Sequence, residues 1–554
     1  MRRILVLNLS RMGDLVQSVP FLTALKNRPE PTEVHLLVEK AFASVTPLLP
    51  SHDAVHVLSH DEILPPLHQA VQTNLLDLYH LFRGALRTLQ GNFDEVWNLT
   101  HTRPSMILTH LLGGERGRGV TVDERGFQLV RSPWLRYFFA TNLARPYCQF
   151  NLVDIYAQCA GPLSRPNRLE LIPERDAERF ADRFFSEQKL EIGKVIAFQL
   201  GAAHPSKRWP VESFRRLANR IGQKLQRPII LLGHKTEKDL AASFEGMPGV
   251  FSLVGQTTIP QLFSILRRCR LLISNDTGTI HLAAGAGLPI IAITLGTALG
   301  SETAPYGEGH IVIEPDVPCF PCSYQRSCAT RQCHEAIQPD TVFEILCRLL
   351  ECRDSFRNIF PKARVYATAI NPQDYMLELR PLVPAEPSLR DQLQAVVRPL
   401  WRRVLGASEM TIEGEKIPVN DETMRLNAVA DRALPLARRA LAELERMSAL
   451  CREKPQPVKS LWRSSQTLAE IDKILEATLD SHALLRSFWG FTALTKASIE
   501  NGPLDAQVNE TRRAYCDLDF LLKGLKDSLQ EKEITSVKYE NRKESCHEGA
   551  LEWS

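Results

Sequence analysis

Residues 270–286 read RLLISNDTGTIHLAAGA and contain the turn on which the fold prediction depends. The run at 270–274 is typical of a buried strand, and the small residues after position 277 are typical of a closely packed helix. A polar turn that leads directly from a strand into a helix is a feature of doubly wound α/β domains. We therefore predict a strand at 270–274 and a helix at 277–286.

Short apolar runs alternate with amphipathic stretches on both sides of this turn. They predict strands at 3–7, 33–38, 95–99, 194–199, 228–232 and 289–294, and helices at 15–26, around 67–90, and at 211–224, 237–243 and 259–268. The pattern restarts near 162–173, so we predict two α/β domains, at 1–165 and 166–353. Ligands bind such folds at the carboxyl ends of the strands.

Composition narrows the function classes. The 554 residues are 44% hydrophobic and carry a net charge of +3, too small for this length to predict a nucleic-acid partner. The apolar run after Arg2 and Arg3 is too short for a signal peptide, and no run is long enough to span a bilayer. Twelve cysteines in such a chain are typical of a reducing compartment. We expect a cytoplasmic protein.

Three loops carry candidate chemistry. Gly13 and Asp14 follow the first predicted strand, where Asp14 faces the expected cleft or simply caps the next helix, which is worth about 1 kcal/mol. Free amides near Thr277 and Gly278 can hold a diphosphate, although small residues there also suit close packing. Lys207 lies in the loop at 201–210 and would face the same cleft, unless it is an ordinary solvated lysine.

In combination these elements are specific. Gly13-Asp14 with Pro20 and Lys26, Lys207-x-Trp209-Pro210, Gly233 with Glu237, and Asn275-Asp276-Thr277-Gly278 with His281 occur in order. The combination closely resembles glycosyltransferase family 9, the heptosyltransferases that extend the lipopolysaccharide core from ADP-heptose. The resemblance covers residues 1 to about 350 and implies a GT-B fold with an acceptor-binding first domain and a nucleotide-sugar-binding second domain.

The resemblance also implies roles for individual residues. Asp14 matches the catalytic base and Lys207 the diphosphate-binding lysine. The donor-binding positions are Ser10, Gly13, Glu237, Asp276, Thr277, Gly278 and His281, with Glu237 matching the residue that holds the nucleoside. The expected reaction is inverting sugar transfer to a lipid-linked glycan acceptor, without a metal cofactor, because a lysine and helix amides stabilise the leaving diphosphate.

One segment departs from the family pattern. Residues 295–303 read LGTALGSET, where these enzymes usually have a Phe-Gly-Pro-Thr-like turn. Two alternatives therefore stay open: a glycosyltransferase that uses another nucleotide sugar, and a non-catalytic nucleotide-sugar-binding protein of the same fold. A Rossmann oxidoreductase is disfavoured, because no G-x-G-x-x-G follows the first strand.

Four cysteines are spaced as C-x2-C-x5-C-x4-C, at Cys319, Cys322, Cys328 and Cys333. This spacing allows a structural zinc or iron–sulfur site, and a similar loop occurs in many family members. A set of partly buried thiols is the alternative.

A basic and aromatic stripe is predicted between residues 101 and 150. It contains seven arginines, with Trp134, Tyr137, Phe138 and Phe139 among them. Such a stripe suits an anionic membrane surface or a phosphorylated acceptor, whereas ordinary core aromatics with solvated arginines would show the same pattern. We favour the first interpretation and expect a peripheral contact at the cytoplasmic face of the inner membrane.

The pattern changes from Asp354 onward. Apolar residues at three- and four-residue spacing predict long amphipathic helices at 389–405, 420–451, 459–501 and 504–530. We expect a helical accessory domain at 354–530 and a disordered tail at 531–554. The resemblance does not explain this third of the chain, whose role could be lipid contact, partner binding or oligomerisation.

Overall fold

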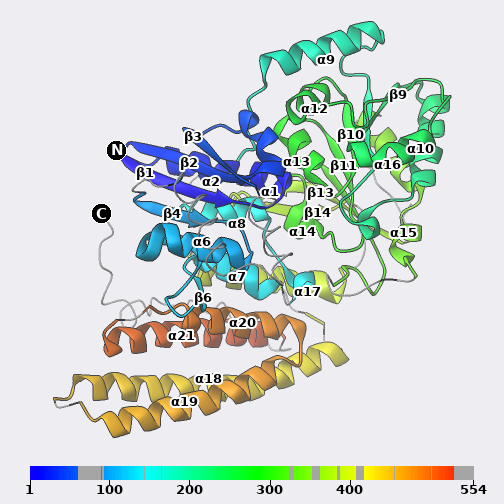
Figure 1. Cartoon of the computed structure of the whole chain (residues 1–554). Coiled ribbons are helices and arrows are strands. Elements are labelled where there is room, and N and C mark those ends of the chain that lie inside the picture. Colours follow the sequence, from blue (N-terminus) through cyan, green and yellow to red (C-terminus); the bar gives the residue numbers. More distant parts are fainter. Residues whose placement is uncertain are drawn as a thin grey trace, which may run out of the picture. The chain divides into compact units, whose positions relative to one another are not determined.

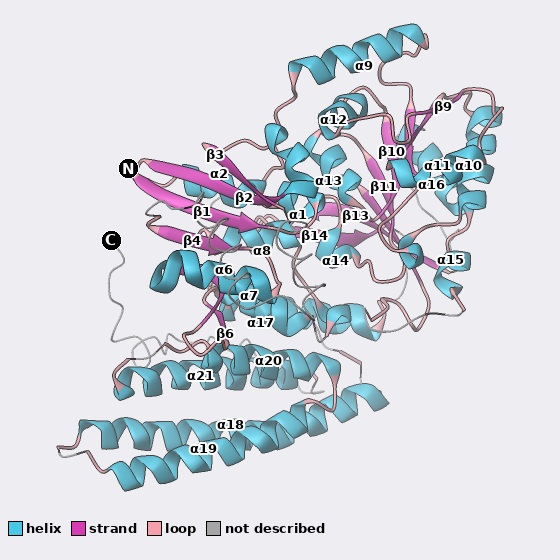
Figure 2. Cartoon of the chain, in the orientation of Figure 1, coloured by secondary structure: helices cyan, strands magenta, loops and turns pink. Residues whose placement is uncertain are grey.

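The computed structural model describes residues 1–59, 89, 93–142, 144–163, 165–323, 328, 330–351, 362–382, 387–406, 417–418, 420–454, 456–500 and 502–529. The chain forms two compact units, one of Met1–Gly126 with Phe150–Ala385 and one of Phe127–Gln149 with Glu386–Ser554 (Figure 1). The first contains two sheets and the second is mainly helical (Figure 2). The helix expected around 67–90, apart from Leu89, and the tail at 531–554 lie outside the described residues.

The first sheet is built around a strand that is buried on both faces. In β1 (Arg2–Asn8) the run from Ile4 to Leu7 is fully buried, as expected for a parallel strand covered by helices on both sides. Within the first unit the strand order is β3-β2-β1-β4-β5, all parallel, with β2 at Thr32–Glu39, β3 at Ala54–Leu58, β4 at Glu95–Asn98 and β5 at Gly117–Val122.

The helix expected at 15–26 is two helices, α1 (Met12–Gln17) and α2 (Val19–Lys26). Ser18 ends α1, and Pro20 lies in the first turn of α2, where its missing N–H costs no helical hydrogen bond. The other elements of this half are η1 (Lys40–Leu48), α6 (Arg103–Gly113) and α8 (Leu152–Cys159).

Helix α8 connects the two halves of the first unit. It packs against α1 and α2, and its Asp154 is fully buried. Asp154 Oδ1 accepts a hydrogen bond from Tyr306 Oη at 2.5 Å, and Oδ2 accepts one from the amide of Leu377 at 2.9 Å. Because Tyr306 and Leu377 belong to the second half, this carboxylate fixes α8 to both.

The second sheet has the parallel order β12-β11-β10-β7-β8-β9. Its core contains Phe198, Trp209 and Phe214. The strands are β7 (Ile196–Gln199), β8 (Ile229–Leu232), β9 (Val250–Ser252), β10 (Leu271–Asn275), β11 (Ile290–Ile293) and β12 (Ile311–Pro315). The helices are α9 (Arg175–Glu187), α10 (Val211–Lys224), α11 (Lys238–Ala242), α12 (Ile259–Leu266), α13 (Gly278–Gly285), α14 (Gly300–Thr303), α15 (Gln332–Ala336) and α16 (Pro339–Glu351). The predicted pair of doubly wound sheets is confirmed.

The start of the helical region is a correction to the sequence-based expectation. Residues beyond Asp354 first form two more strands, β13 (Ala363–Ile370) and β14 (Leu377–Pro381), which extend the second sheet antiparallel from β12. The first unit therefore runs to Ala385. These strands were missed because they are only partly buried and carry polar residues such as Arg364 and Arg380 among their apolar ones.

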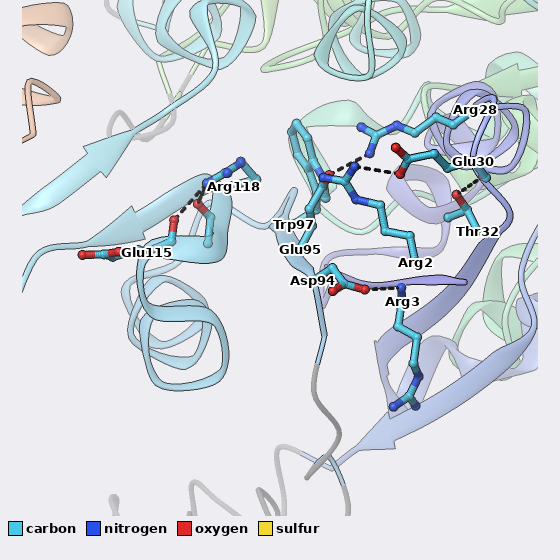
Figure 3. A network of polar contacts seen from close by, with 11 residues as sticks. Arg2, Arg3, Arg28, Glu30, Thr32, Asp94, Glu95, Trp97, Glu115 and Arg118 are labelled. Carbon is cyan, nitrogen blue, oxygen red and sulfur yellow. Dashed lines mark hydrogen bonds and ion pairs between the residues drawn. The ribbon is translucent and has the colours of Figure 1, made fainter. Parts of the chain in front are cut away.

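A charged network lies at the amino ends of the first-sheet strands (Figure 3). Arg2 and Arg28 bind Glu95 Oε1 at 2.6 and 2.8 Å, and Trp97 Nε1 donates to Glu95 Oε2 at 2.5 Å. Burial raises the pKa of Glu95, but the Trp97 hydrogen bond and the two guanidinium groups outweigh it, so the net shift is downward. Ligands bind at the opposite, carboxyl-end edge of such sheets, so we assign this network to the structure and not to the site.

The second unit is a helical assembly around Trp401. This side chain is fully buried and makes edge-to-face contacts with Tyr137, Phe488 and Phe491 at centroid distances of 5.1–5.5 Å. Its elements are β6 (Gln128–Val130), α7 (Pro133–Thr141), α17 (Leu389–Val404), α18 (Asp421–Arg452), α19 (Val458–Leu479), α20 (Ala483–Ala497) and α21 (Leu504–Ser528). The helix expected at 459–501 is two helices, because α19 ends at Leu479 and His482 caps α20.

The expected basic and aromatic stripe is not one surface. Trp134 and Tyr137 are buried in the helical unit, so these two aromatic side chains are core residues. Arg116 and Arg136 donate to backbone carbonyls at 2.8 and 2.7 Å, which assigns them structural hydrogen bonds. In the part of the chain that the structure describes, no helix is both long and apolar enough to cross a membrane.

Candidate active site

The candidate loops follow strands at the switch points of both sheets. In the first sheet β1 lies between β2 and β4, so the chain adds β2 and β3 on one side of β1 and β4 on the other. In the second sheet β7 and β10 are neighbours although β8 and β9 come between them in the sequence. Such switch points are where doubly wound folds bind ligands. The loop after β1 contains Asp14, the loop after β7 contains Lys207, and the turn after β10 contains Asp276.

Two glycines let α1 and α13 come into backbone contact. A Cβ atom on Gly13 would lie 3.0 Å from His281 Cδ2, and one on Gly278 would lie 2.5 Å from Met12 Cε. Gly13 and Gly278 thus let the amino-terminal turns of the two helices meet. The contact places the loops of the first and second sheets at one location within the first unit.

Asp14 is half-buried at the start of α1. Its Oδ2 accepts a hydrogen bond from the amide of Arg11 at 3.0 Å, which is the bond of a helix-capping carboxylate. Burial nevertheless raises the pKa of Asp14, and the nearby Asp276 carboxylate adds to the rise, while Arg11 and Lys207 oppose it. A carboxylate whose pKa is raised is a stronger base than a solvated one.

The Lys207 ammonium is paired with Asp276. Lys207 Nζ lies 2.5 Å from Asp276 Oδ2, and the two side chains are 16% and 9% exposed. Thr303 Oγ1 donates to the other oxygen, Asp276 Oδ1, at 2.9 Å. Burial alone would raise the pKa of Asp276, but Lys207 and these hydrogen bonds outweigh it and the net shift is downward. Asp276 is therefore a carboxylate that holds the lysine in place.

Asn275 fixes the loop that carries Lys207. Its buried amide Nδ2 donates to the carbonyls of Leu200 and Gly201 at 2.8 and 3.2 Å, and its Oδ1 accepts from the amide of Trp209 at 2.8 Å. The Trp209 indole in turn donates to the carbonyl of Ile337 at 2.9 Å. Lys207 is thus held between two anchored ends of its loop.

His281 lies one turn into α13 and is only 4% exposed. Burial lowers the pKa of His281 to about 4, although the Asp276 carboxylate opposes this shift. The imidazole is therefore neutral near pH 7. Thr277 caps the helix, since its hydroxyl accepts from the amide of Thr279 at 3.3 Å.

Glu237 lies across the carboxyl ends of β7 and β8. Its Oε2 accepts from the amide of His234 at 2.9 Å and from Gln199 Nε2 at 3.4 Å. A Cβ atom would lie 1.7 Å from Glu237 Oε1 at Gly201 and 2.7 Å from Oε2 at Gly233. Only glycine at these two positions leaves room for the carboxylate.

Ser10 lies in the loop between β1 and α1 and is half-buried. Its amide donates to Asn8 Oδ1 at 3.4 Å, and Asn8 Nδ2 donates to the carbonyl of Asp14 at 3.1 Å. The fully buried Asn8 therefore holds both ends of this loop.

Comparison with known proteins agrees with this geometry. The family described as Glycosyltransferase family 9 (heptosyltransferase) matches residues 156–333. Residues 156–333 belong to glycosyltransferase family 9. A lipopolysaccharide heptosyltransferase 1 of Pseudomonas aeruginosa is 21% identical over 320 residues, which are 58% of this chain and 86% of that protein. A lipooligosaccharide heptosyltransferase 2 of Campylobacter jejuni is 29% identical over 168 residues, 28% of this chain and about half (51%) of that protein.

A solved structure of E. coli ADP-heptose LPS heptosyltransferase II is similar at 18% identity and a TM-score of 0.45. The similarity covers 64% of this chain and 100% of that one. The helical unit, Phe127–Gln149 with Glu386–Ser554, lies outside the residues that the family model matches.

The four cysteines of this family 9 glycosyltransferase do not fit a metal site as the structure places them. Cys319 and Cys328 are exposed, Cys322 is half-buried and Cys333 is buried. Among the described residues, which leave out 324–327 and 329, no group of three or more His, Cys, Asp or Glu side chains is placed to hold a metal ion. Burial raises the pKa of Cys333, whereas the amide of Arg331 and neighbouring hydrogen bonds lower that of Cys328. The Cys319 and Cys328 thiols also raise the pKa of Cys333, so these three cysteines lie near one another.

Sequence reasoning missed Thr303, which binds Asp276 from a position 27 residues later. The segment 295–303 drew attention only as a departure from the family pattern, and no spacing rule links its last residue to the turn after β10. One feature could have identified it: Thr303 ends the segment that follows β11, and β11 is the neighbour of β10 in the sheet.

Proposed function

We propose that this glycosyltransferase transfers heptose from ADP-heptose to a lipopolysaccharide core or a related lipid-linked glycan, with inversion at the anomeric carbon. The single observation that carries the proposal is the meeting of Asp14 with the Lys207–Asp276 pair at facing switch points. A base and a cation on opposite sides of one location suit a displacement in which a proton leaves one end and negative charge develops at the other.

Asp14 acts at the acceptor end. Its carboxylate takes the proton of an acceptor hydroxyl while that oxygen attacks the anomeric carbon of the donor sugar. The bond between that carbon and the diphosphate oxygen breaks on the opposite face, and the diphosphate leaves with the electron pair. One displacement of this kind inverts the configuration.

Lys207 acts at the donor end. An ammonium group has three N–H donors, and the bond to Asp276 uses one of them. The other two are available to the diphosphate oxygens, beside the amino-terminal turn of α13, whose helix dipole adds positive charge. The chain's own residues thus supply the positive charge that the leaving group needs.

The remaining expected residues are assigned by position. Glu237, at the carboxyl ends of β7 and β8, would accept hydroxyl groups of the nucleoside, and Ser10 and Gly13 would border the sugar beside Asp14. Neutral His281 and Thr277 belong to the same donor loop as Asp276. The proposal of a cytoplasmic enzyme is supported by the ten described cysteines, none of which forms a disulfide.

The names of the relatives in Pseudomonas and Campylobacter support transfer of heptose to a lipopolysaccharide- or lipooligosaccharide-type acceptor. A second candidate, transfer from another nucleotide sugar, is favoured by the segment 295–303, because its Thr303 reaches Asp276 in the donor loop. A panel of nucleotide sugars tested for competition with ADP-heptose separates the two: the better donor is the stronger competitor.

The test of the mechanism is Asp14→Asn in the full chain, assayed by nucleotide release from ADP-heptose in the presence of acceptor. We expect turnover to fall by roughly 10²–10⁴-fold while ADP binding stays within about twofold, since a lost general base affects the chemical step. Asp94→Asn is the matched control, because Asp94 accepts from the amide of Arg3 at the opposite edge of the same sheet. Near-normal turnover of Asp14→Asn would refute the base assignment. ADP binding without turnover by the unaltered protein would favour a non-catalytic binding protein.

A further inference from the structure

The turn between α18 and α19 is strongly basic. Residues 446–463, which we call the α18–α19 tip, contain five cationic side chains and one acidic side chain: Arg446, Arg452, Lys454, Lys459 and Arg463 against Glu453. All six are exposed. The whole chain carries a net charge of only +3, so this excess of four is a local feature.

The same tip exposes two large apolar side chains. Val458 is 73% exposed and Trp462 is 62% exposed, one turn apart at the start of α19. The buried face of α19 is formed by other residues, among them Leu461, Leu468 and Leu475. Trp462 therefore contributes nothing to the helical core, and it is the one exposed tryptophan among those that the structure describes. An exposed indole among cations is typical of a side chain that sits at a membrane interface.

A row of arginines leads along α18 into the tip. Arg425, Arg432, Arg439 and Arg446 are seven residues apart, so they lie along one side of the helix, and all four are exposed. The positions between them are small: Ala428, Pro435 and Ala442. This side of α18 is therefore a row of long cationic side chains with little bulk between them.

The charge of this row is not neutralised within the protein. In the described part of the chain Arg425, Arg432 and Arg439 form no ion pair, and Arg446 has only Glu443 at 3.9 Å. Asp431 on the same helix is bound by Lys526, so its negative charge does not compensate the charge of the arginine row. These guanidinium groups are available to an external anion.

We propose that the α18–α19 tip and the arginine row bind an anionic phospholipid surface, with Trp462 and Val458 at the level of the headgroups. Cations next to an amphipathic anchor are attracted by the negative surface potential of such a membrane, and the aromatic ring adds apolar burial. Two exposed apolar side chains are too few for a stable protein interface, which covers about 800 Å² on each partner. The inference does not rest on the proposed function, because it concerns the helical unit alone.

The test is co-sedimentation of the full chain with phosphatidylcholine vesicles and with vesicles of equal parts phosphatidylcholine and phosphatidylglycerol, without donor or acceptor. We expect binding to the anionic vesicles only, weakened by high salt. The triple variant R452Q/K459Q/R463Q should bind on the order of a hundredfold more weakly, since each cation near the surface contributes roughly fivefold. R175Q/R179Q/R183Q on α9 removes three exposed arginines elsewhere and should bind normally.

Trp462→Ser tests the apolar contact. Fluorescence quenching by brominated lipid should be seen with the unaltered protein and largely lost in this variant, whereas Ile474→Ser, 50% exposed on the same helix beyond the tip, should be quenched normally. Circular dichroism of each variant verifies that the helices remain folded. Unchanged binding of the triple variant, or equal binding to neutral vesicles, would overturn the proposal. If the unaltered protein self-associates but does not bind vesicles, and the triple variant loses this self-association, the proposal is overturned. The occupant of the surface would then be a second copy of the chain.

Discussion

A Cβ atom at Gly13 would lie 3.3 Å from the Cα atom of Gly278, and one at Gly278 would lie 3.2 Å from the amide nitrogen of Gly13. The two halves of the first unit therefore meet backbone to backbone at the point where the candidate site is assembled. Any side chain at either position would separate Asp14 from the donor loop.

Gly13→Ala should therefore lower transfer strongly. The added methyl group would press on the His281 ring at 3.0 Å and on α13, and a displacement of the order of 1 Å at reacting groups costs roughly a hundredfold in rate. Steady-state kinetics with saturating donor is the measurement. Gly222→Ala in α10 is the control, since a Cβ there meets nothing within 4 Å and alanine favours a helix. Normal activity of Gly13→Ala would mean that the contact is not part of the site.

Asp14→Asn should raise the melting temperature at pH 7. The pKa of Asp14 is raised in the folded protein, so the folded state releases this proton at a higher pH than the unfolded state does, and at neutral pH its buried charge costs stability. Asparagine keeps an acceptor for the Arg11 amide without the charge. The gain should shrink as the pH falls through the folded pKa and vanish below 3.8, the ordinary value. A melting temperature that falls at pH 7 would contradict this account.

Thr303→Val should weaken the reaction by roughly tenfold or more, because a hydrogen bond to a charged group is worth about 1.5–3 kcal/mol. Valine retains the shape but removes the donor to Asp276 Oδ1, so the pKa of Asp276 rises and its hold on Lys207 weakens. Thr303→Ser keeps the hydroxyl and should restore most of the rate. A purely structural threonine would instead show equal losses of melting temperature in both variants and no shift in the pH–rate profile.

Gly201→Ala should reduce nucleotide affinity with little effect on stability. Its Cβ would overlap the Glu237 carboxylate, which is the far end of a flexible side chain and can swing away at low cost. Calorimetric titration measures the affinity for ADP, and the melting temperature of the same variant measures its stability. The two measurements together separate an effect on binding from an effect on folding. If ADP affinity is unchanged, Glu237 does not hold the nucleoside.

Acid should destabilise the protein below pH 6.5. Burial lowers the pKa values of His281 and His310 to about 4, so between pH 6.5 and about 4 the unfolded state binds protons at these residues that the folded state does not. Each histidine contributes stability that is fully present above pH 6.5 and falls by an amount on the order of 3 kcal/mol by pH 4. His310→Asn should therefore flatten the dependence of the free energy of unfolding on pH. An unchanged slope in denaturant titrations would disprove the assignment.

The sequence predicted most of the strands, helices and turns that depend on a local pattern of residues. The run from Ile4 to Leu7 and the small residues after Gly278 identify a buried strand and a tight helix by themselves, and the spacing of Asp14, Lys207 and Asp276 follows from the strand-to-helix turns. The roles of these residues stay predictions until the variants are measured.

What the sequence did not give depends on contacts between distant residues. The partly exposed strands β13 and β14 carry charged residues such as Arg364 and Arg380, and they become strands because β13 pairs with β12 and β14 pairs with β13. The aromatic residues Trp134 and Tyr137 read as a surface because nothing in the sequence shows that Trp401, more than 250 residues later, covers Tyr137.

The attachment of α8 at Asp154 limits how the two halves of the first unit can move. Sliding of one sheet past the other would break the bonds from Tyr306 and from the amide of Leu377 to one buried carboxylate, and the loss of hydrogen bonds to a buried charge is costly. Rotation about this point would keep both bonds. We therefore expect any opening and closing around a substrate to be a hinge motion with its pivot at Asp154, and not a shear.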